Sequence, residues 1–386
     1  MRIKQIYIIN TCSVTNESDK KSRKMINRAK KNNPAAIIIV MGCYSQVNAE
    51  DIDVDIVLGN KDKSKIVEII EEYIKTKQKK IIYDLTKVDF EKMEITNFDS
   101  HTRAFVKIQD GCNAFCSYCI IPYVRGRVRS KDPEDVIKEV TTLVEKGYKE
   151  IVLTGIHTGR YGTDINTTLE ELLNKLVNIP NIYRIRLSSI EINEITPGIK
   201  ELLKENKVMA KHLHIPLQSG SNKILKLMNR RYNKEEFLSM VDNLRDIPDI
   251  SLTTDLIVGF PNEDEEEFNE TIDTLKKIGF TKIHTFPYSK RKGTPAAIMD
   301  NQVFPEEKKK RVHRILDLSN KYEHNFYESK IGKIYDGVVE IHSNGTTIVH
   351  TSNFIPVIIN DIVEEGTIVD VKIEKVEDLK VYGRIV

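Results

Sequence analysis

The feature that most constrains this chain is a group of three cysteines, Cys112, Cys116 and Cys119, spaced C-x3-C-x2-C. Three thiolates on one loop can ligate three irons of a 4Fe–4S cluster, which leaves the fourth iron open to a small molecule. Structural zinc sites, in contrast, are closed by four Cys or His ligands. The first histidine upstream, His101, is eleven residues away, and no fourth ligand stands at zinc-finger spacing. The pattern therefore favours an iron–sulfur loop over a zinc site.

The rest of the composition is that of an ordinary globular protein. At 386 residues, with 40% apolar and 30% charged side chains, the chain is long enough for two or three domains. The longest apolar run, Ala35 to Met41, is too short to span a bilayer. The start, Met1 to Gln5, has no signal-peptide pattern. We therefore expect a cytoplasmic protein without a membrane partner, in whose reducing surroundings the five cysteines serve as ligands.

Residues 1–75 alternate apolar runs with charged helical segments, which predicts a parallel, doubly wound sheet. Cys12 and Cys43 each follow a predicted strand, at the edge where open α/β sheets bind ligands. Two buried structural cysteines are the alternative interpretation. Residues 76–101 lack this alternation of strands and helices and are interpreted as a linker. The predicted strands are 6–9, 36–41 and 55–58, and the predicted helices are 16–31 and 61–73.

Residues 102–326 alternate six strands with six helices, which predicts a partial TIM-type (β/α)6 barrel. Chemistry in such barrels lies at the carboxyl ends of the strands, and the cysteine loop directly follows the first strand. The acidic run after Asn262 is interpreted as the start of a helix rather than a metal site. The predicted strands are 104–109, 150–154, 183–188, 211–215, 252–258 and 281–286. The predicted helices are 133–146, 168–177, 194–205, 221–228, 233–245 and 264–278.

Residues 327–386 have a different pattern, in which short strands of alternating apolar and polar residues are divided by turns such as Ser343-Asn344-Gly345. This pattern predicts a small antiparallel β-barrel, a fold often used to hold RNA. The predicted strands are 334–340, 347–350, 356–359, 369–375 and 379–385.

Polar and glycine-containing loops follow several strands of the predicted barrel. Glycine allows backbone to approach a ligand closely, and hydroxyl or carboxylate groups can bind its polar atoms. Plain βα turns are the alternative, and Glu191 could instead begin the next helix. Tyr118 and Phe115 would shield a cluster from water. The candidate ligand-binding residues are Tyr118, Gly155, His157, Ser189, Glu191, Asp255 and Gly259.

Three basic runs lie near the same predicted barrel face. Charge runs are usually solvated surface, but three together favour a phosphate-binding rim. The net charge of +2 leaves any nucleic-acid affinity to such local patches. The candidate RNA-binding residues are Arg125, Arg127, Arg129, Arg230, Arg231, Lys290 and Arg291.

The cysteine spacing resembles that of the radical S-adenosylmethionine (SAM) enzymes, and the domain order resembles their methylthiotransferase family. That family has a flavodoxin-like domain, a radical SAM barrel and a C-terminal TRAM barrel. The matching motifs are Asn10-Thr11-Cys12-Ser13-Val14-Thr15, Gly42-Cys43-Tyr44-Ser45-Gln46 and Gly111 to Tyr123. Segments 152–159, 212–221 and 286–291 look like the subgroup that acts on N6-threonylcarbamoyladenosine beside the anticodon of tRNA.

The resemblance implies a SAM-chelated 4Fe–4S cluster on Cys112, Cys116 and Cys119, which would serve catalysis, and an auxiliary 4Fe–4S cluster on Cys12 and Cys43. It implies an enzyme that adds a methylthio group to C2 of the modified adenosine. The barrel-mouth residues would then contact SAM, and the basic residues the tRNA anticodon loop. An electron donor such as a flavodoxin or ferredoxin is a further expected partner.

One departure from the family pattern concerns the first domain. The family carries three cysteines there, and the first, on an earlier strand, has no counterpart before Cys12. We therefore expect a truncated flavodoxin-like domain without its first βα unit, and either a truncated start or an incomplete auxiliary site. The alternatives are another tRNA adenosine or a ribosomal protein as substrate, an RNA-binding protein with a zinc loop, and an inactive copy.

Overall fold

The computed structural model describes residues 5–85, 88–95, 98, 102–343 and 346–386. The chain forms two compact units. The first unit comprises Met1–Met93, Asp110–Arg129 and Ser289–Ile298, and the second comprises Glu94–Gln109, Ser130–Tyr288 and Met299–Val386. None of the helices in the described ranges is long and apolar enough to cross a membrane.

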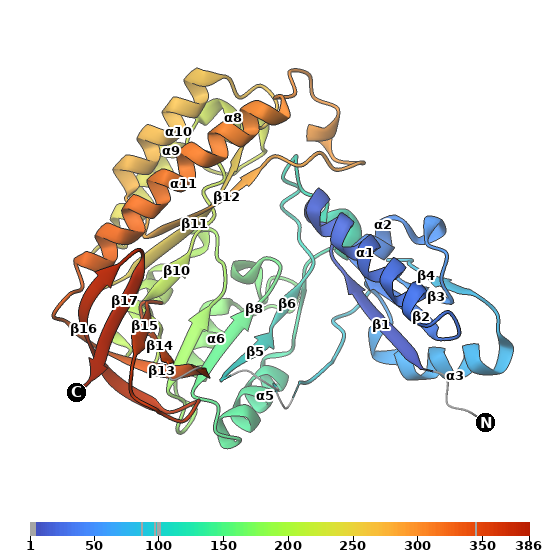
Figure 1. Cartoon of the computed structure of the whole chain (residues 1–386), viewed down its shortest axis with the longest axis horizontal. Helices are drawn as coiled ribbons and strands as arrows, with labels where there is room; N and C mark the ends of the chain where they lie inside the picture. The colour runs from blue at the N-terminus through green and yellow to red at the C-terminus, as the bar shows by residue number, and fades with distance from the viewer. Residues whose placement is uncertain (1–4, 86–87, 96–97, 99–101, 344–345) are drawn as a thin grey trace. The chain divides into compact units, whose positions relative to one another are not determined.

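The first unit is built on a parallel sheet with the strand order β1-β2-β3-β4. In β2, Ile38 and Val40 pack with Ile26 of α1, whereas Ile37 and Ile39 pack with Ile69 of α3. Successive side chains of a strand point to opposite faces, so α1 and α3 cover opposite faces of this sheet (Figure 1). The elements are β1 (Ile6–Thr11), α1 (Asn16–Asn32), β2 (Ile37–Gly42), α2 (Cys43–Val47), β3 (Ile56–Leu58), α3 (Ile66–Thr76), β4 (Lys80–Ile82) and α4 (Ile121–Arg125).

The predicted doubly wound sheet is confirmed, but β4 lies in the segment for which the sequence predicts a linker. Its three residues pair with β3 from Ile56↔Lys80 to Leu58↔Ile82. A strand of three residues among polar neighbours carries too short a pattern to be recognised from periodicity. The first sheet therefore extends further along the chain than expected.

Among the described residues of the second unit, six parallel strands form two three-stranded sheets, β5-β8-β9 and β10-β11-β12. The backbone of Ile185 in β9 joins them, because its N–H bonds to the oxygen of Val208 and its oxygen accepts from Ala210. The strands are β5 (Arg103–Lys107), β8 (Glu150–Thr154), β9 (Arg184–Leu187), β10 (His212–His214), β11 (Ser251–Val258) and β12 (Lys282–Pro287). The short strands β6 (Gln109–Asp110) and β7 (Arg129–Ser130) pair with each other.

In the described part of the chain, six helices alternate with these strands, so the partial TIM-type barrel is confirmed. Acidic residues mark several helix starts. Asp264 caps α10 by accepting hydrogen bonds from the backbone of Glu266 and Glu267, which confirms that the acidic run begins a helix. The helices are α5 (Pro133–Glu145), α6 (Leu169–Leu176), α7 (Pro197–Glu205), α8 (Asn222–Leu227), α9 (Lys234–Asp242) and α10 (Glu265–Ile278).

One long helix, α11 (Pro305–Glu328), is absent from the sequence predictions. It packs along the edge strand β12, where the Ser319 hydroxyl accepts a hydrogen bond of 2.9 Å from the Ile283 N–H. Its buried residues recur every four positions, but most of them are polar or charged. They are Arg311, Ile315, Ser319, Glu323 and Tyr327.

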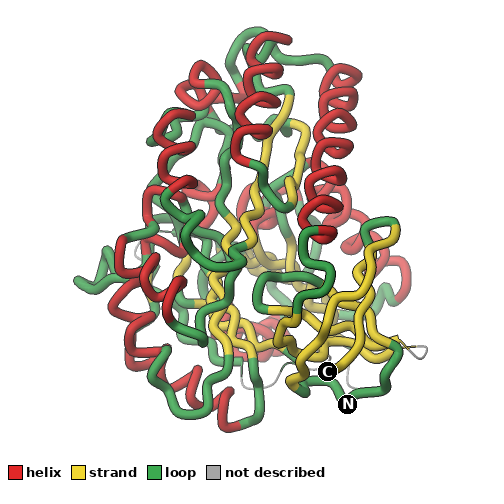
Figure 2. Tube along the Cα trace, turned by 90° about the vertical axis from the view of Figure 1, so that its left-hand side faces the viewer, coloured by secondary structure: helices red, strands yellow, loops and turns green. Residues whose placement is uncertain are grey.

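The C-terminal strands close into the predicted five-stranded barrel, with the order β13-β14-β15-β17-β16 (Figure 2). Its interior is filled by alternate valines and isoleucines, including Val349, Val371 and Val381. The strands are β13 (Ile334–Ser343), β14 (Thr346–Thr351), β15 (Pro356–Ile359), β16 (Ile368–Glu377) and β17 (Lys380–Ile385). The tip residues Asn344 and Gly345 of the predicted turn lie outside the described residues.

Candidate active site

All five cysteines of the chain lie in the first unit. Strands β1 and β2 are parallel and end in register at Thr11↔Gly42, so Cys12 and Cys43 leave the sheet side by side. The Thr11 hydroxyl fastens the two strand ends, since it donates to the Met41 oxygen at 2.6 Å and accepts from the Ser45 N–H at 3.3 Å. The two cysteines therefore share the carboxyl edge at which parallel sheets bind ligands, as predicted.

The three-cysteine loop depends on one glycine. Gly111 has φ +71°, and a Cβ there would lie 1.8 Å from the Arg127 carbonyl oxygen. The returning strand of the loop approaches this closely because the Cys112 N–H bonds to the Gly126 oxygen at 3.0 Å. The Cys119 N–H bonds to the Cys116 oxygen at 2.9 Å and closes the turn between the last two thiols. Only glycine fits position 111 without moving this backbone.

The thiols of this loop are largely removed from water. Cys112 and Cys116 are buried, and Cys119 is half-buried. Phe115 takes the left-handed conformation with φ +51°. Its ring meets Tyr123 edge-on at 5.6 Å, and the Arg127 guanidinium lies 4.7 Å from the ring centre. Phe115 thus packs within the loop.

Helix α4, which follows the cysteine loop, packs against Cys43. The Cys43 side chain clusters with Ile120 and Val124, and the Asn60 amide donates to the Val124 oxygen at 2.8 Å. The same amide lies 3.5 Å from the Cys43 sulfur. The loop and the edge that carries Cys43 are therefore in direct contact within the first unit.

Arg125 lies between the two sulfur-bearing regions. Burial opposes its charged form, but the nearby Cys43 sulfur and Asp110 carboxylate raise the pKa of Arg125 above its usual value. Its Nη1 is 3.1 Å from the Asp110 carboxylate. The Arg125 guanidinium thus places a positive charge next to the Cys43 sulfur.

The donor set fits an iron–sulfur cluster. None of the five cysteines, all of which lie in the described ranges, forms a disulfide bond. Within the described ranges, no three His, Cys, Asp or Glu side chains converge on one point that could hold a single metal ion. Thiolates that bind different irons of a cluster do not need to share such a point. Three mostly buried thiols on a loop of fixed backbone are the ligands that a 4Fe–4S cluster with one open iron requires.

The predicted cofactor residues that follow β8 and β9 belong to the second unit. Gly155 is close to Gln109, whose side-chain oxygen would be 3.0 Å from a Cβ added at position 155. The same oxygen accepts a hydrogen bond of 2.8 Å from the His157 N–H. The His157 ring pairs with Glu194 at 2.9 Å. Ser189 is half-buried, and Glu191 forms an ion pair with Arg230. The sequence did not predict the ion pair between Glu191 and Arg230.

The two predicted cofactor residues of β11 and its loop have different surroundings. Asp255 lies 3.3 Å from the His214 ring, and its register partner on β12 is His284. Gly259 has φ +69°, and the stem of Lys308 would be 2.3 Å from an added Cβ. Gly259 is therefore required for the packing of α11, in addition to any role in binding a ligand. Tyr118, the remaining predicted residue, is half-buried in the first unit.

The predicted basic rim divides into paired and exposed residues. The side chains of Arg230 and Arg291 are only 5% and 7% exposed, and each pairs with a carboxylate. Here the structure differs from the expected exposed rim, because a buried, neutralised guanidinium does not present its charge to phosphate. Arg125 and Arg129 both pair with Asp110. Arg127, Arg231 and Lys290 are exposed.

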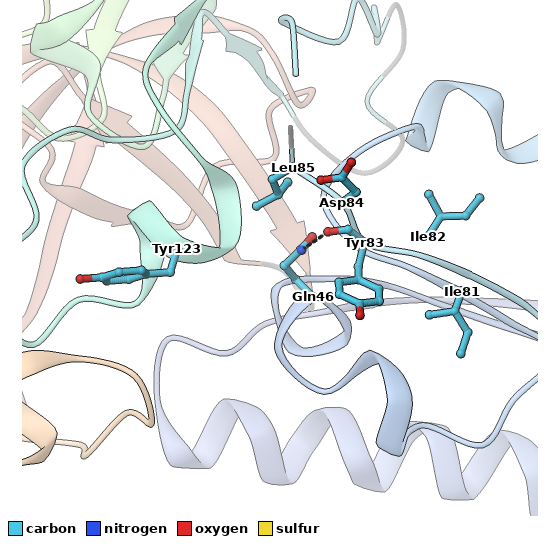
Figure 3. Close-up of a pocket in the computed structure, with 7 residues that line it drawn as sticks. All are labelled: Gln46, Ile81, Ile82, Tyr83, Asp84, Leu85 and Tyr123. Carbon is cyan, nitrogen blue, oxygen red and sulfur yellow. Dashed lines mark hydrogen bonds between the residues drawn. The ribbon is translucent and has the colours of Figure 1, made fainter. Parts of the chain in front are cut away.

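Sequence reasoning missed a pocket of about 550 Å³ in the first unit (Figure 3). The Gln46 amide spans it, since its nitrogen donates to the Tyr83 oxygen and its oxygen accepts from the Asn60 N–H at 2.8 Å. Gln46 stands in the matched motif that contains Cys43, which is the signal that could have pointed here. The lining residues are Gln46, Ile81, Ile82, Tyr83, Asp84, Leu85 and Tyr123.

Two family models match this chain. Residues 106–275 match the model described as the radical SAM superfamily. Residues 4–59 match the model described as uncharacterized protein family UPF0004. The first match contains the three-cysteine loop, and the second contains Cys12 and Cys43. Membership of the radical SAM superfamily implies a 4Fe–4S cluster and SAM.

Curated relatives cover nearly the whole chain. The threonylcarbamoyladenosine tRNA methylthiotransferase MtaB of Bacillus subtilis (strain 168) is 43% identical over 96% of this chain and 85% of its own length. The protein of the same name from Aquifex aeolicus (strain VF5) is 42% identical over 85% and 82%. A tRNA-2-methylthio-N(6)-dimethylallyladenosine synthase from Thermoanaerobacter sp. (strain X514) is 37% identical over 99% and 84%.

Among solved structures, the radical SAM methyltransferase TsrM from Kitasatospora setae has a TM-score of 0.58 at 12% identity. The match covers 76% of this chain and less than two thirds, 64%, of TsrM. This likeness shows the fold alone. Two relatives with the same name are more than 40% identical to this chain over most of both lengths, and the two family models match it as well. The protein therefore belongs to the radical SAM methylthiotransferase family.

Proposed function

We propose that this protein is a tRNA methylthiotransferase that replaces the C2 hydrogen of N6-threonylcarbamoyladenosine, next to the anticodon, with a methylthio group. The observation that carries the proposal is the gathering of the three-cysteine loop and the Cys12–Cys43 edge in one unit. The chain's 43% identity to a threonylcarbamoyladenosine tRNA methylthiotransferase supports this substrate.

In this proposal Cys112, Cys116 and Cys119 hold a 4Fe–4S cluster whose open iron takes SAM. The cluster and SAM together supply radical chemistry, which can act on a strong, unactivated C–H bond such as that at C2 of adenine. The chain itself fixes the three thiols through Gly111 and the backbone bonds of the loop, and keeps water from two of them. Tyr118, Gly155, His157, Ser189, Glu191, Asp255 and Gly259 are the proposed contacts of SAM.

Cys12 and Cys43 are the proposed ligands of an auxiliary cluster. Asn60 and Arg125 lie beside Cys43 and place an amide donor and a positive charge next to its sulfur. Both thiols leave adjacent strand ends, so they can bind to one cluster. This second site is where we expect the transferred sulfur to be held.

The substrate is the anticodon loop of tRNA, whose unstacked nucleotides enter a protein site at low cost. The exposed side chains of Arg127, Arg231 and Lys290 are the proposed phosphate contacts, and the five-stranded C-terminal barrel is a proposed second RNA surface. A small reducing protein such as a flavodoxin or ferredoxin is the proposed electron donor.

The proposal is tested by mass spectrometry of tRNA nucleosides from cells that lack their own enzyme of this kind and express this protein. We expect methylthio-threonylcarbamoyladenosine to appear with the wild-type chain and not with Cys116→Ala. If the methylthio group appears on isopentenyladenosine instead, the substrate is the one named for the relatives at 37% identity. The assignment to threonylcarbamoyladenosine would then be wrong.

A further inference from the structure

The segment Ser289–Ile298 follows the last barrel strand, β12, yet it belongs to the first unit. Both of its chain neighbours, Tyr288 and Met299, belong to the second unit. A segment that leaves its own domain and packs in another calls for a physical explanation. Its polar contacts supply one, because they reach both cysteine-bearing regions.

At its start, the segment contacts the first turn of α1 through Arg291. The guanidinium is 2.6 Å from the Asp19 carboxylate, 2.5 Å from the Asn16 side-chain oxygen and 2.8 Å from the Ser289 hydroxyl. The Arg291 side chain is 7% exposed, and that of Asp19 is 17% exposed. A charge pair with this little water contact is costly to break from one side. Arg291 is therefore an anchor on α1.

The anchor is one hydrogen bond away from Cys12. Asp19, the partner of Arg291, also accepts a hydrogen bond of 2.8 Å from the hydroxyl of Ser13, the residue after Cys12. The Ser22 hydroxyl donates to the Cys12 backbone oxygen at 3.2 Å. Arg291 thus holds the carboxylate that fixes the loop directly after Cys12.

Further along, the same segment binds the other cysteine loop. The Ala296 N–H donates to the backbone oxygen of Ser117, at 2.8 Å, and Ser117 stands between Cys116 and Cys119. The Thr294 hydroxyl donates to the Arg291 oxygen at 2.8 Å, so a compact turn joins the two contact points. Ala296 and Thr294 are both buried. A hydrogen-bonded turn of a few residues therefore connects the Cys12 loop to the Cys116–Cys119 turn.

We infer that Ser289–Ile298 sets the distance between the two cysteine-bearing loops, with Arg291 as the positioning residue. The inference rests on the proposed function, in which sulfur held at one loop must reach a substrate carbon activated at the other. A misplacement of about 1 Å between reacting groups can cost about 10²-fold in rate. Arg291 acts here through Asp19 and touches neither cofactor nor substrate.

The test compares Arg291→Met, Arg291→Lys and the control Lys292→Met, whose side chain is exposed one position along. In the apoprotein, hydrogen exchange is measured on peptides that cover residues 10–22 and 112–119. In the reconstituted protein, iron content, 5′-deoxyadenosine and the methylthio nucleoside are measured together. We expect Arg291→Met to raise exchange in both peptides and to lower methylthio product about 10²-fold, with 5′-deoxyadenosine retained. Arg291→Lys should restore part of the product, and Lys292→Met should match the wild type.

The outcomes are distinct. Exchange and product equal to the wild type in Arg291→Met would overturn the inference, and so would a parallel loss of 5′-deoxyadenosine, which indicates a general structural role. If Arg291→Met does not fold, Asp19→Asn breaks the same contact from the other side and must show the same uncoupling. If the wild type makes no methylthio nucleoside, the proposed function fails, whereas the exchange comparison still decides whether Arg291 couples the loops.

Discussion

Different interactions stabilise the functional regions inside each of the two units. In the first unit, backbone hydrogen bonds and glycine geometry hold the three-cysteine loop, as at Gly111 and between Cys112 and Gly126. In the second unit, buried charges hold the base of the barrel. There Glu150 is fully buried and accepts from Arg186 at 2.6 Å and from Arg184 at 3.3 Å.

This buried charge network also attaches the C-terminal barrel. Arg186 donates to the backbone oxygens of Thr351 and Ser352, which precede β15, and Arg103 pairs with Glu340 of β13. The difference shows that the three-cysteine loop is held mainly by backbone geometry. The proposed RNA-binding barrel is instead fixed by ion pairs, which break only at a high cost.

The largest expected effect is the loss of chemistry when a loop thiol is removed. Cys116→Ala should abolish both 5′-deoxyadenosine and the methylthio nucleoside in reconstituted protein, because the cluster loses one of its three ligands. The matched control, Cys12→Ala, should lose the methylthio product and retain 5′-deoxyadenosine. Both products are measured by mass spectrometry. Continued 5′-deoxyadenosine formation by Cys116→Ala would refute the cluster assignment.

The second prediction removes the charge at the base of the barrel. Burial opposes ionisation, but Arg186, Arg184 and Arg103 lower the pKa of Glu150 from 4.5 to about 2. Glu150→Gln removes the buried carboxylate that these arginines share and should lower the free energy of unfolding by about 3–5 kcal/mol. Glu377→Gln, an exposed pair with Lys375, should change it by less than about 0.5 kcal/mol.

The depressed pKa gives this contribution a pH dependence. It is fully present above the usual value near 4.5 and is lost as the pH falls toward about 2. The difference in stability between wild type and Glu150→Gln should therefore shrink across this range in urea titrations. If the difference in unfolding free energy between the two proteins stays constant down to a pH of about 2, the ion-pair account is contradicted.

The third prediction tests the backbone geometry of the cysteine loop. Gly111→Ala should destabilise the loop strongly and lower its iron content after reconstitution, because the new Cβ would meet the Arg127 oxygen. Gly147→Ala is the matched control, with φ +96° and no atom within 4 Å of the added Cβ. It carries only the conformational strain of about 1 kcal/mol. Equal iron content in the two variants would show that the close approach is unimportant.

The smallest effect is expected from single exposed cations. Arg127→Ala should weaken tRNA binding and reduce the slope of log K against log salt by about 0.7 to 0.9, since one phosphate contact is lost. Arg231→Ala should act similarly. Asp19→Asn, which weakens contacts of Asp19 with Arg291 and Ser13 inside the first unit, should leave the slope unchanged. An unchanged slope in Arg127→Ala would remove this residue from the RNA interface.

Much of the fold could be predicted from the sequence because it follows strong periodic patterns. The buried strands and amphipathic helices of the barrel lie within a few residues of their predicted positions. Helix α11 was missed because its buried face carries Arg311, Ser319 and Glu323, whose burial depends on partners elsewhere in the chain. Pro305 followed by two glutamates was the available start signal.

The site could be predicted only in part. The spacing of Cys112, Cys116 and Cys119 is a local property, and the strand-end positions of Cys12 and Cys43 follow from alternation. The burial of Arg230 and Arg291 was not predictable, because it depends on Glu191 and Asp19, which are far away in the sequence. A charge run does not distinguish a buried arginine from an exposed one.

The central claim, that the three-cysteine loop carries the SAM-binding cluster, is tested most directly by iron and sulfide analysis after anaerobic reconstitution. The comparison is between a variant with Cys12 and Cys43 changed to Ala and a variant with Cys112, Cys116 and Cys119 changed to Ala. We predict that the first variant retains about four iron atoms per chain and its brown colour. Four iron atoms retained by the second variant and lost from the first would contradict the account.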